Sequence, residues 1–394
     1  MSERNTVFKE ERLMANIIDY VRETGEFVFH EKTFNPVDSL VLSQLSYIKF
    51  DGIVSGLKER NPYITLKEIC DHSIANTAFQ NVLDSKNNET LFTIAAQSQR
   101  FGGMKLNFFI DDIDESAEKQ FSAITFLLDD GTAFIAVRGT DETVIGWKED
   151  FNMAFMSPVP SQVQGVEYFN KVAESTACGL RIGGHSKGGN ISVYAAMKCK
   201  RDYQDRIIDI YSHDGPGFRN EIFSDDDYMR IRDRIHKYLP QSSVVGMFLQ
   251  SQEEYSIVDS HQIGLLQHDL FTWQIDRDDF KYKDALKDSS IIVNTAVNEW
   301  LNSIDDVNRK KFIDTFYHVI QSSEISTLFD LTVRQRKTTK AFLKAIQDID
   351  PNTRRFVLKT IRSLFSIAAK SSRKLRMTKI IDFIKGLKKP IVRK

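Results

Sequence analysis

A glycine-rich pentapeptide holds the residue best suited to covalent chemistry. Gly184-His185-Ser186-Lys187-Gly188 has the GxSxG spacing of a nucleophile elbow, in which a serine sits on a sharp turn between a strand and a helix. The flanks fit, because residues 178–182 form a short apolar run and residues 190–197 carry apolar side chains at helical spacing. Glycines are needed where the strained turn and the following helix approach closely. The pattern therefore predicts Ser186 as a nucleophile.

A serine hydroxyl is a poor nucleophile at neutral pH and needs a base, which in turn needs an orienting acid. In elbow-type folds these partners follow the serine, in the order acid and then histidine. The histidines after Ser186 are His213, His236, His261, His268 and His318. We favour His268, which lies in a loop after the last expected strand. His213 leaves no room for an intervening acid, His236 and His318 fall in expected helices, and His261 lies in a plainer loop.

The acid has several candidates. Asp214 follows the strand after the elbow and lies in a Gly-Pro-Gly turn whose rigidity would fix a carboxylate, although the same residue could simply cap that turn. Glu253 and Glu254 follow the next expected strand, and Asp259 lies further on. The residues alone do not choose between Asp214 and the glutamate pair.

An oxyanion hole needs two donors aimed at the developing negative charge. One should be the backbone N–H of the residue after the nucleophile, here Lys187. The other should come from a loop after an earlier strand, here Gly139 and Thr140, with the Thr140 hydroxyl as a further donor. We expect the Lys187 side chain to point along the first helical turn into solvent, and the alternative is that it binds a carboxylate or phosphate of the substrate.

Alternating strands and helices must position these residues. Strands are expected at 104–110, 121–128 and 133–137, with a hairpin at Asp129-Asp130-Gly131-Thr132, because Asp-Gly between two β-rich runs favours a tight turn. A helix at 163–176 leads into the elbow strand, and a strand at 206–211, a helical segment at 221–239 and a strand at 242–249 follow. This order predicts an α/β fold, mainly a parallel sheet with helices on both faces.

The ends of the chain differ from this core. The pattern predicts a helical flank over 1–100, the α/β core over 101–285 and a helical basic extension over 286–394. Residues 354–394 hold 14 Lys and Arg against one acid, Asp382. Within them, 373–389 carries an apolar stripe among lysines, which is either a solvated helical face or a surface for anionic lipid.

Composition excludes several classes of protein. The chain has 394 residues with 53 basic and 54 acidic side chains, so bulk binding of nucleic acid is not expected. Three scattered cysteines argue against a disulfide framework or a zinc site, and no metal or cofactor motif is present. The polar N-terminus has no signal-peptide pattern, which favours the cytoplasm, with peripheral membrane association as an option. Oligomeric state is not indicated.

Together the motifs resemble those of class 3 (fungal-type) lipases. The matching residues are Val137-Arg138-Gly139-Thr140, Trp147 with Asp150, 184–190, and His268 with Trp273. A narrower resemblance is to the bacterial Mbeg-like family of α/β hydrolases. It is carried by residues 37–47, 214–218, 243–247 and 267–269, so the likeness spans about residues 35–275.

The resemblance implies an α/β-hydrolase fold, catalytic roles for Ser186 and His268, and Thr140 at the oxyanion hole. It implies no particular substrate. The chain departs from class 3 lipases at Lys187, where they usually have leucine, and it has no clear D-x-V-P acid motif. We therefore expect a serine esterase or lipase-like hydrolase acting on a small-molecule or lipid ester, and the alternative is a non-catalytic binding or scaffold protein of the same fold.

Overall fold

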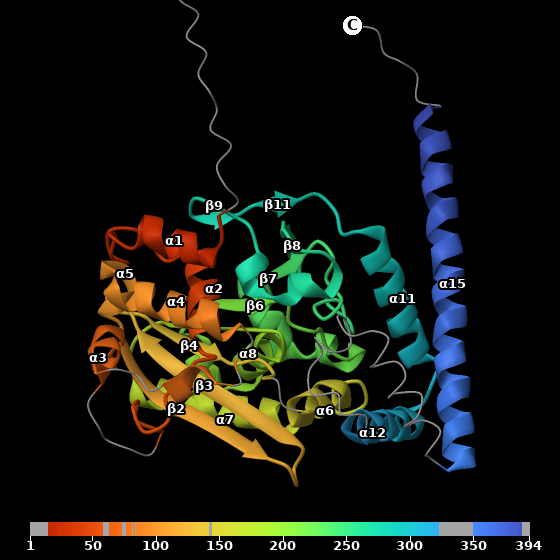
Figure 1. The fold of residues 1–394 in the computed structure, drawn as a ribbon, viewed down its shortest axis with the longest axis horizontal. Coiled ribbons are helices and arrows are strands. Elements are labelled where there is room, and N and C mark those ends of the chain that lie inside the picture. The colour runs from red at the N-terminus through yellow and green to blue at the C-terminus, as the bar shows by residue number, and fades with distance from the viewer. Residues whose placement is uncertain are drawn as a thin grey trace, which may run out of the picture.

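The computed structural model describes residues 15–57, 63–72, 76–80, 82, 84–141, 144–322 and 350–387. A nine-stranded sheet crosses the molecule in the order β1-β2-β3-β4-β5-β6-β7-β8-β11 (Figure 1). The strands of this sheet are β1 (Ile64–Thr65), β2 (Lys105–Asp114), β3 (Lys119–Leu127), β4 (Ala133–Val137), β5 (Leu180–His185), β6 (Ile207–His213), β7 (Ile235–Pro240), β8 (Tyr255–Val258) and β11 (Tyr282–Lys283). A separate two-stranded ribbon pairs β9 (Ile275–Asp276) with β10 (Asp279–Phe280).

The sheet is mixed, and its parallel half runs from β4 to β8. Antiparallel strands extend it on both sides, with β1 to β3 next to β4 and β11 next to β8. The expected hairpin between β3 and β4 is present, with Leu127 opposite Ala133. Because parallel strands end at one edge of a sheet, β4, β5 and β6 bring the loops that follow them together.

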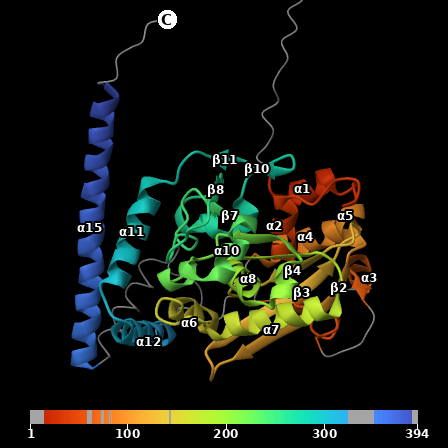
Figure 2. The ribbon, with the colours of Figure 1, turned by 180° about the vertical axis from the view of Figure 1, so that it is seen from behind.

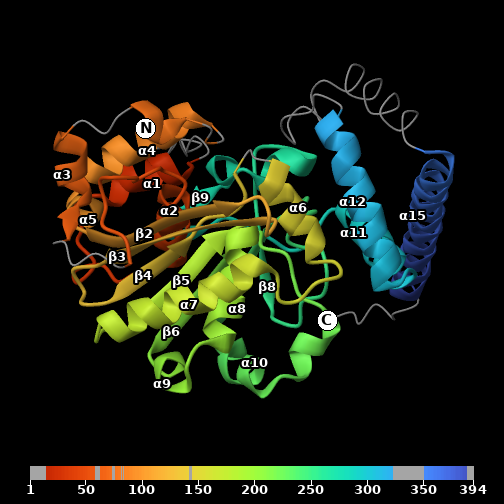
Figure 3. The same cartoon turned by 90° about the horizontal axis from the view of Figure 1, so that it is seen from below.

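Helices cover both faces of the sheet, as the sequence predicts. Successive residues of β4 alternate between two cores, with Phe134 and Ala136 in one and Ile135 and Val137 in the other. Figure 3 shows α1, α2 and α4 on one side of the sheet and α7 and α8 on the other. The helices of the flank and core are α1 (Ile17–Thr24), α2 (Pro36–Leu45), α3 (Leu66–Asp71), α4 (Ser85–Gln97), α5 (Gln99–Gly102), α6 (Val144–Asn152), α7 (Pro160–Ser175), α8 (Lys187–Lys198), α9 (Arg201–Gln204) and α10 (Asp226–Ile231). These two layers enclose β4, β5 and β6, which carry the candidate site at their ends.

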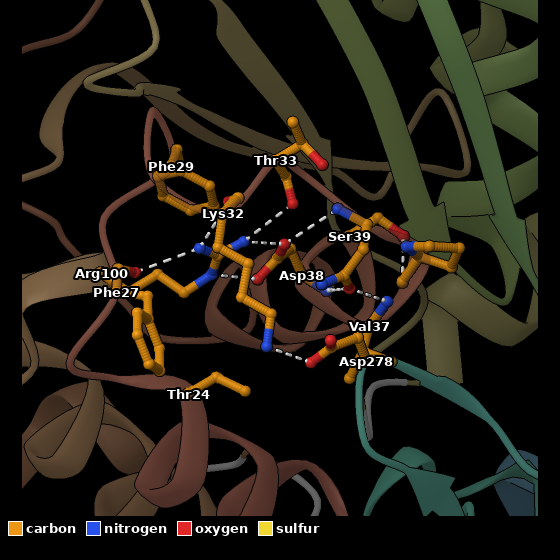
Figure 4. Close-up of polar contacts among 12 residues, drawn as sticks. Thr24, Phe27, Phe29, Lys32, Thr33, Val37, Asp38, Ser39, Arg100 and Asp278 are labelled. Atoms are coloured by element: carbon orange, nitrogen blue, oxygen red, sulfur yellow. Dashed lines mark hydrogen bonds and ion pairs between the residues drawn. The ribbon is translucent and has the colours of Figure 1, made fainter.

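A buried ion pair fixes α2 within the N-terminal flank. The Arg100 guanidinium donates to both carboxylate oxygens of Asp38, at 2.7 and 2.5 Å, and both side chains have no solvent exposure (Figure 4). Its remaining donors reach the backbone carbonyls of Phe27, Lys32 and Thr33. Asp38 also accepts the Asn35 N–H, so the same carboxylate caps the start of α2. Because every group is paired, the charges are tolerated inside the flank.

Three helices form the described part of the C-terminal region. They are α11 (Asp288–Asn302), α12 (Asp306–Ser322) and α15 (Pro351–Leu387). In Figures 1 and 2, α15 lies alongside α11, and its C-terminal end extends beyond it. Within the helical extension expected over 286–394, residues 323–349 and 388–394 lie outside the described residues. In the described ranges, no helix combines the length and apolarity needed to cross a membrane.

Two expected elements between β6 and β8 are wrong. The segment 221–239 is not one helix: a 3₁₀ turn at Asn220–Ser224 and the short α10 are followed by β7 at Ile235–Pro240. The strand expected over 242–249 is instead a series of turns. Charged residues next to Ile235 and Leu239 hid the apolar character of β7, and one of them, Lys237, has a side chain that is buried against Glu253.

Candidate active site

The elbow has the backbone geometry that its spacing predicts. β5 ends at His185, Ser186 adopts φ 56° and ψ −130°, and α8 begins at Lys187. This left-handed conformation is strained for a residue with a side chain. The flanking glycines are required by contact, because a Cβ on Gly184 or Gly188 would lie 2.3 or 2.1 Å from the Val137 carbonyl oxygen. The neighbouring β4 therefore packs directly against the turn.

A continuous chain of hydrogen bonds joins Ser186, His268 and Asp214. The Ser186 Oγ lies 3.0 Å from His268 Nε2, and His268 Nδ1 lies 2.6 Å from Asp214 Oδ2. The Asp214 side chain is buried, whereas that of His268 is 21% exposed. The three groups have the order and spacing of a nucleophile, its base and an orienting acid.

The Asp214 carboxylate is held by a turn that follows β7. Its Oδ1 accepts the Ser243 hydroxyl at 2.5 Å and the Gly246 N–H at 3.1 Å, so Oδ2 is directed to His268. The Asp214 backbone N–H donates to the Tyr238 carbonyl, and its φ is 50°. The turn that replaced the expected strand over 242–249 thus supplies the donors that fix this carboxylate.

The other acid candidates lie elsewhere. Glu253 is buried, where it accepts the Tyr228 hydroxyl at 2.9 Å and pairs with Lys237 at 3.4 Å. Glu254 is exposed to solvent, and Asp259 pairs with lysines of the β11 region, including Lys283 at 3.1 Å. Among the carboxylates weighed from the sequence, it is therefore Asp214 that reaches His268.

Two of the remaining histidines are bound within the sheet. His236 lies on β7, not in a helix, and its Nε2 pairs with Asp209 at 2.9 Å. His213 ends β6, and its Nε2 lies 2.9 Å from the Ser39 hydroxyl. The Ser39 hydroxyl donates to the Pro36 carbonyl, so it accepts from His213. Burial lowers the pKa of His213 to about 3, which keeps this ring neutral.

The His185 ring packs against that of His268, a contact that sequence reasoning missed. Its ring centroid lies 4.4 Å from that of His268, and its Nδ1 lies 2.9 Å from the Tyr47 hydroxyl. Burial lowers the pKa of His185 well below its ordinary value, and the nearby His268 acts in the same direction. A neutral ring therefore packs against His268. No spacing rule marks Tyr47, because it comes from the turn after α2, 138 positions before His185.

The loop after β4 lies beside the elbow. Arg138 is buried and binds Asp111 through two hydrogen bonds of 2.6 and 3.1 Å, which anchor the start of the loop on β2. A Cβ on Gly139 would lie 3.2 Å from the Ser186 Cβ, so this backbone passes directly against the serine. Thr140 follows, in the region from which a second oxyanion donor is expected.

The Thr140 hydroxyl has a partner of its own. It donates to Asp150 Oδ2 at 2.6 Å, and a hydroxyl has a single proton to give. Burial raises the pKa of Asp150 to about 6, so at neutral pH its carboxylate is mostly ionised and accepts the hydrogen bond from Thr140. The donors that remain are then the backbone N–H groups of Thr140 and of Lys187, which as the first residue of α8 has no intrahelical acceptor.

The expected orientation of the Lys187 side chain is wrong. The side chain has no solvent exposure, and its Nζ donates to the Gln120 carbonyl at 2.9 Å and to Glu149 Oε2 at 3.0 Å. The Lys187 ammonium is therefore paired with a carboxylate of the protein itself. This rules out the alternative that Lys187 binds a carboxylate or phosphate of the substrate. Sequence spacing gave no sign of Glu149, because that residue lies 38 positions earlier on α6.

The chain is similar to one protein family and to a solved lipase structure. The Mbeg1-like family matches residues 95–318, more than half of the chain. The chain belongs to the Mbeg1-like family. A crystal structure of M37 lipase is also similar, with 16% identity, a TM-score of 0.33, and coverage of 53% of this chain and 67% of that one. No curated protein matches the chain.

The fold of this Mbeg1-like chain is an α/β-hydrolase fold with a helical C-terminal region. The matched range contains Ser186, Asp214 and His268 together with the loop at Thr140. Ser39 and Tyr47, which contact His213 and His185, lie before it.

Proposed function

We propose that this Mbeg1-like protein is a serine hydrolase that cleaves a carboxylic ester through an acyl-enzyme intermediate. One observation carries the proposal: the Ser186 Oγ, the His268 ring and the Asp214 carboxylate form an unbroken hydrogen-bonded chain of 3.0 and 2.6 Å. The first group of that hydrogen-bonded chain belongs to a residue with positive φ, the backbone conformation expected of a nucleophile elbow. Backbone strain of this kind is concentrated at functional sites.

The residues have separate roles in the proposed reaction. His268 Nε2 accepts the Ser186 proton as Oγ attacks the ester carbonyl, and Asp214 stabilises the imidazolium that forms. The N–H groups of Lys187 and Thr140 donate to the oxyanion. His268 then protonates the leaving alcohol, and the acyl group remains on Ser186. In the second half, His268 takes a proton from water as the water oxygen attacks the acyl carbon. The bond from that carbon to Ser186 Oγ then breaks, His268 returns the proton to Oγ, and the carboxylic acid leaves.

An apolar rim next to the base supports a hydrophobic substrate. Ile263, Leu265 and Leu266 are 71, 45 and 37% exposed, and they lie in the turn that leads to His268. Exposed apolar side chains gathered beside a reactive centre favour an acyl chain or an apolar alcohol. A series of p-nitrophenyl esters of increasing chain length tests this, with rising kcat/KM as the expected result.

A fluorophosphonate probe tests the proposed nucleophile. We expect the probe to label wild-type protein at Ser186, as located by peptide mass analysis, and to leave Ser186→Ala unlabelled. Label that persists equally in Ser186→Ala would place the reactive group elsewhere. If the probe leaves the wild type unmodified, the non-catalytic scaffold takes the place of the hydrolase.

We also propose that the basic C-terminal segment binds anionic membrane surfaces. The supporting features are the continuity of α15 to Leu387 and the apolar stripe among lysines over 373–389 in the sequence. Such a helix can bury its apolar face between headgroups while its lysines contact anionic lipid. This location would bring the hydrolase to a lipid substrate.

A further inference from the structure

Lys187 is the buried cation closest in sequence to the proposed nucleophile. Its ammonium has three protons, and it meets the Gln120 carbonyl at 2.9 Å, Glu149 Oε2 at 3.0 Å and Gln120 Oε1 at 3.4 Å. Neither Lys187 nor Glu149 has any side-chain exposure. Two charges are therefore held out of water directly beneath the elbow. An apolar residue would fill this volume without that desolvation cost.

Glu149 gathers donors from three separate elements. Its Oε2 accepts from Lys187 at the start of α8, from the Gln120 N–H of β3 at 3.1 Å and from the Ser161 hydroxyl of α7 at 2.6 Å. Its Oε1 accepts the Ser161 N–H at 2.8 Å. A carboxylate with four donors in fixed directions has little freedom to move. The pair therefore fixes α6 against α8, β3 and α7 at one point.

Asp150, the next residue of α6, contacts the loop after β4. Asp150 accepts the Thr140 hydroxyl at 2.6 Å, and Thr140 belongs to the loop proposed to supply an oxyanion donor. Consecutive helical residues point in directions about 100° apart, so α6 can hold both groups at once. One helix thus links the residue after the nucleophile, through Glu149, to the oxyanion loop, through Asp150.

We propose that Lys187 and Glu149 are positioning residues, which set the distance between Ser186 and the donor at Thr140. The inference rests on the proposed hydrolase function. Neither side chain touches the reacting atoms, and the Lys187 backbone N–H survives any side-chain substitution. Loss of the pair would let α6 and its loop shift relative to Ser186. Misplacement of a donor by about 1 Å costs on the order of 100-fold in rate.

The test compares two buried ion pairs in the full-length protein. Lys187→Met/Glu149→Leu removes the pair beneath the elbow without leaving an unpaired charge. Lys237→Met/Glu253→Leu removes a pair of similar burial, with side chains 1 and 3% exposed, from the β7 region. For each variant, kcat and KM are measured with a p-nitrophenyl ester, together with the rate of fluorophosphonate labelling and the thermal midpoint.

We expect the first variant to lose about 10- to 100-fold in kcat and in labelling rate, with KM changed less than about twofold. The second variant should keep its kcat within about threefold, whatever its thermal midpoint. A kcat that stays at the wild-type level in the first variant overturns the inference. An equal loss in both variants also overturns it, because a general loss of stability would then explain the effect.

The same measurements distinguish failure of the proposed hydrolase function from failure of the positioning role. If wild-type protein neither hydrolyses the ester nor reacts with the probe, the hydrolase proposal falls, and the positioning role falls with it. If wild type reacts and Lys187→Met/Glu149→Leu reacts equally fast, the hydrolase stands and only the positioning role is lost.

Discussion

Replacement of Asp214 by asparagine reverses a single hydrogen bond at the base. The Asp214 Oδ1 accepts two donors, the Ser243 hydroxyl and the Gly246 N–H. In Asp214→Asn the amide oxygen must take that place, because an amide NH₂ cannot accept. The NH₂ then faces His268 Nδ1 and donates to it. His268 is left with its proton on Nε2, facing Ser186, and it cannot accept the serine proton.

The loss expected from this wrong tautomer is large. In serine hydrolases, the same change in the orienting acid lowers kcat by about 10⁴-fold, equivalent to about 5.5 kcal/mol in the barrier. KM should change little, because the substitution is isosteric and lies behind the base. The measurement is kcat with a p-nitrophenyl ester, checked by the labelling rate of the fluorophosphonate probe.

Glu254→Gln is the matched control for this prediction. It neutralises the other carboxylate that the sequence favours, at an exposed position, and it should leave kcat within about twofold of wild type. A kcat for Asp214→Asn within tenfold of wild type would refute the tautomer argument. A large loss in Glu254→Gln would show that the acid comes from the β8 side and would overturn the assignment of Asp214.

Three further changes probe other parts of the molecule. The pKa of His213 is about 3 in the folded state and about 6.5 in the unfolded state. Below pH 6.5 the unfolded state therefore binds a proton that the folded state does not, and the free energy of unfolding decreases as pH falls. Urea unfolding should show wild type losing about 2 kcal/mol more than His213→Gln between pH 7.5 and pH 5, and equal losses would contradict this. Arg100→Met leaves Asp38 buried and unpaired and should lower the free energy of unfolding by about 3–5 kcal/mol, whereas Lys171→Met, from an exposed pair, should cost under about 1 kcal/mol. Deletion of 371–394 should abolish sedimentation with anionic liposomes, and unchanged binding would argue against a lipid-binding helix.

Sequence reasoning was most effective where one local rule governs the backbone. The elbow follows from glycine spacing, and the β3–β4 hairpin follows from Asp130-Gly131 between two β-rich runs. The buried strand β4 follows from its unbroken apolar run. Each of these features depends on residues within about ten positions of one another, so a single window of the sequence contains the information.

Side chains whose partners lie far away in the sequence could not be placed from the sequence alone. Nothing near Lys187 indicates that Glu149 neutralises it, so solvent was the natural expectation for a lysine at the start of a helix. Likewise, Ser243 belonged to an expected strand, although its hydroxyl is needed to hold Asp214 in a turn. The error at β7 has the same origin, because the Lys237 ammonium is buried against partners that come later in the chain, Ser251 and Glu253.

The N-terminal flank is part of the support for the proposed active site. β5 ends at His185 just before Ser186, and β6 ends at His213 just before Asp214. Both histidines are bound by residues of the α2 region: His185 by Tyr47 at 2.9 Å and His213 by Ser39 at 2.9 Å. Because each histidine immediately precedes a residue of the hydrogen-bonded chain, α2 fixes the ends of both strands from one face of the sheet. The range matched by the family, 95–318, therefore carries the proposed reacting groups but lacks the helix that holds the strands beneath them.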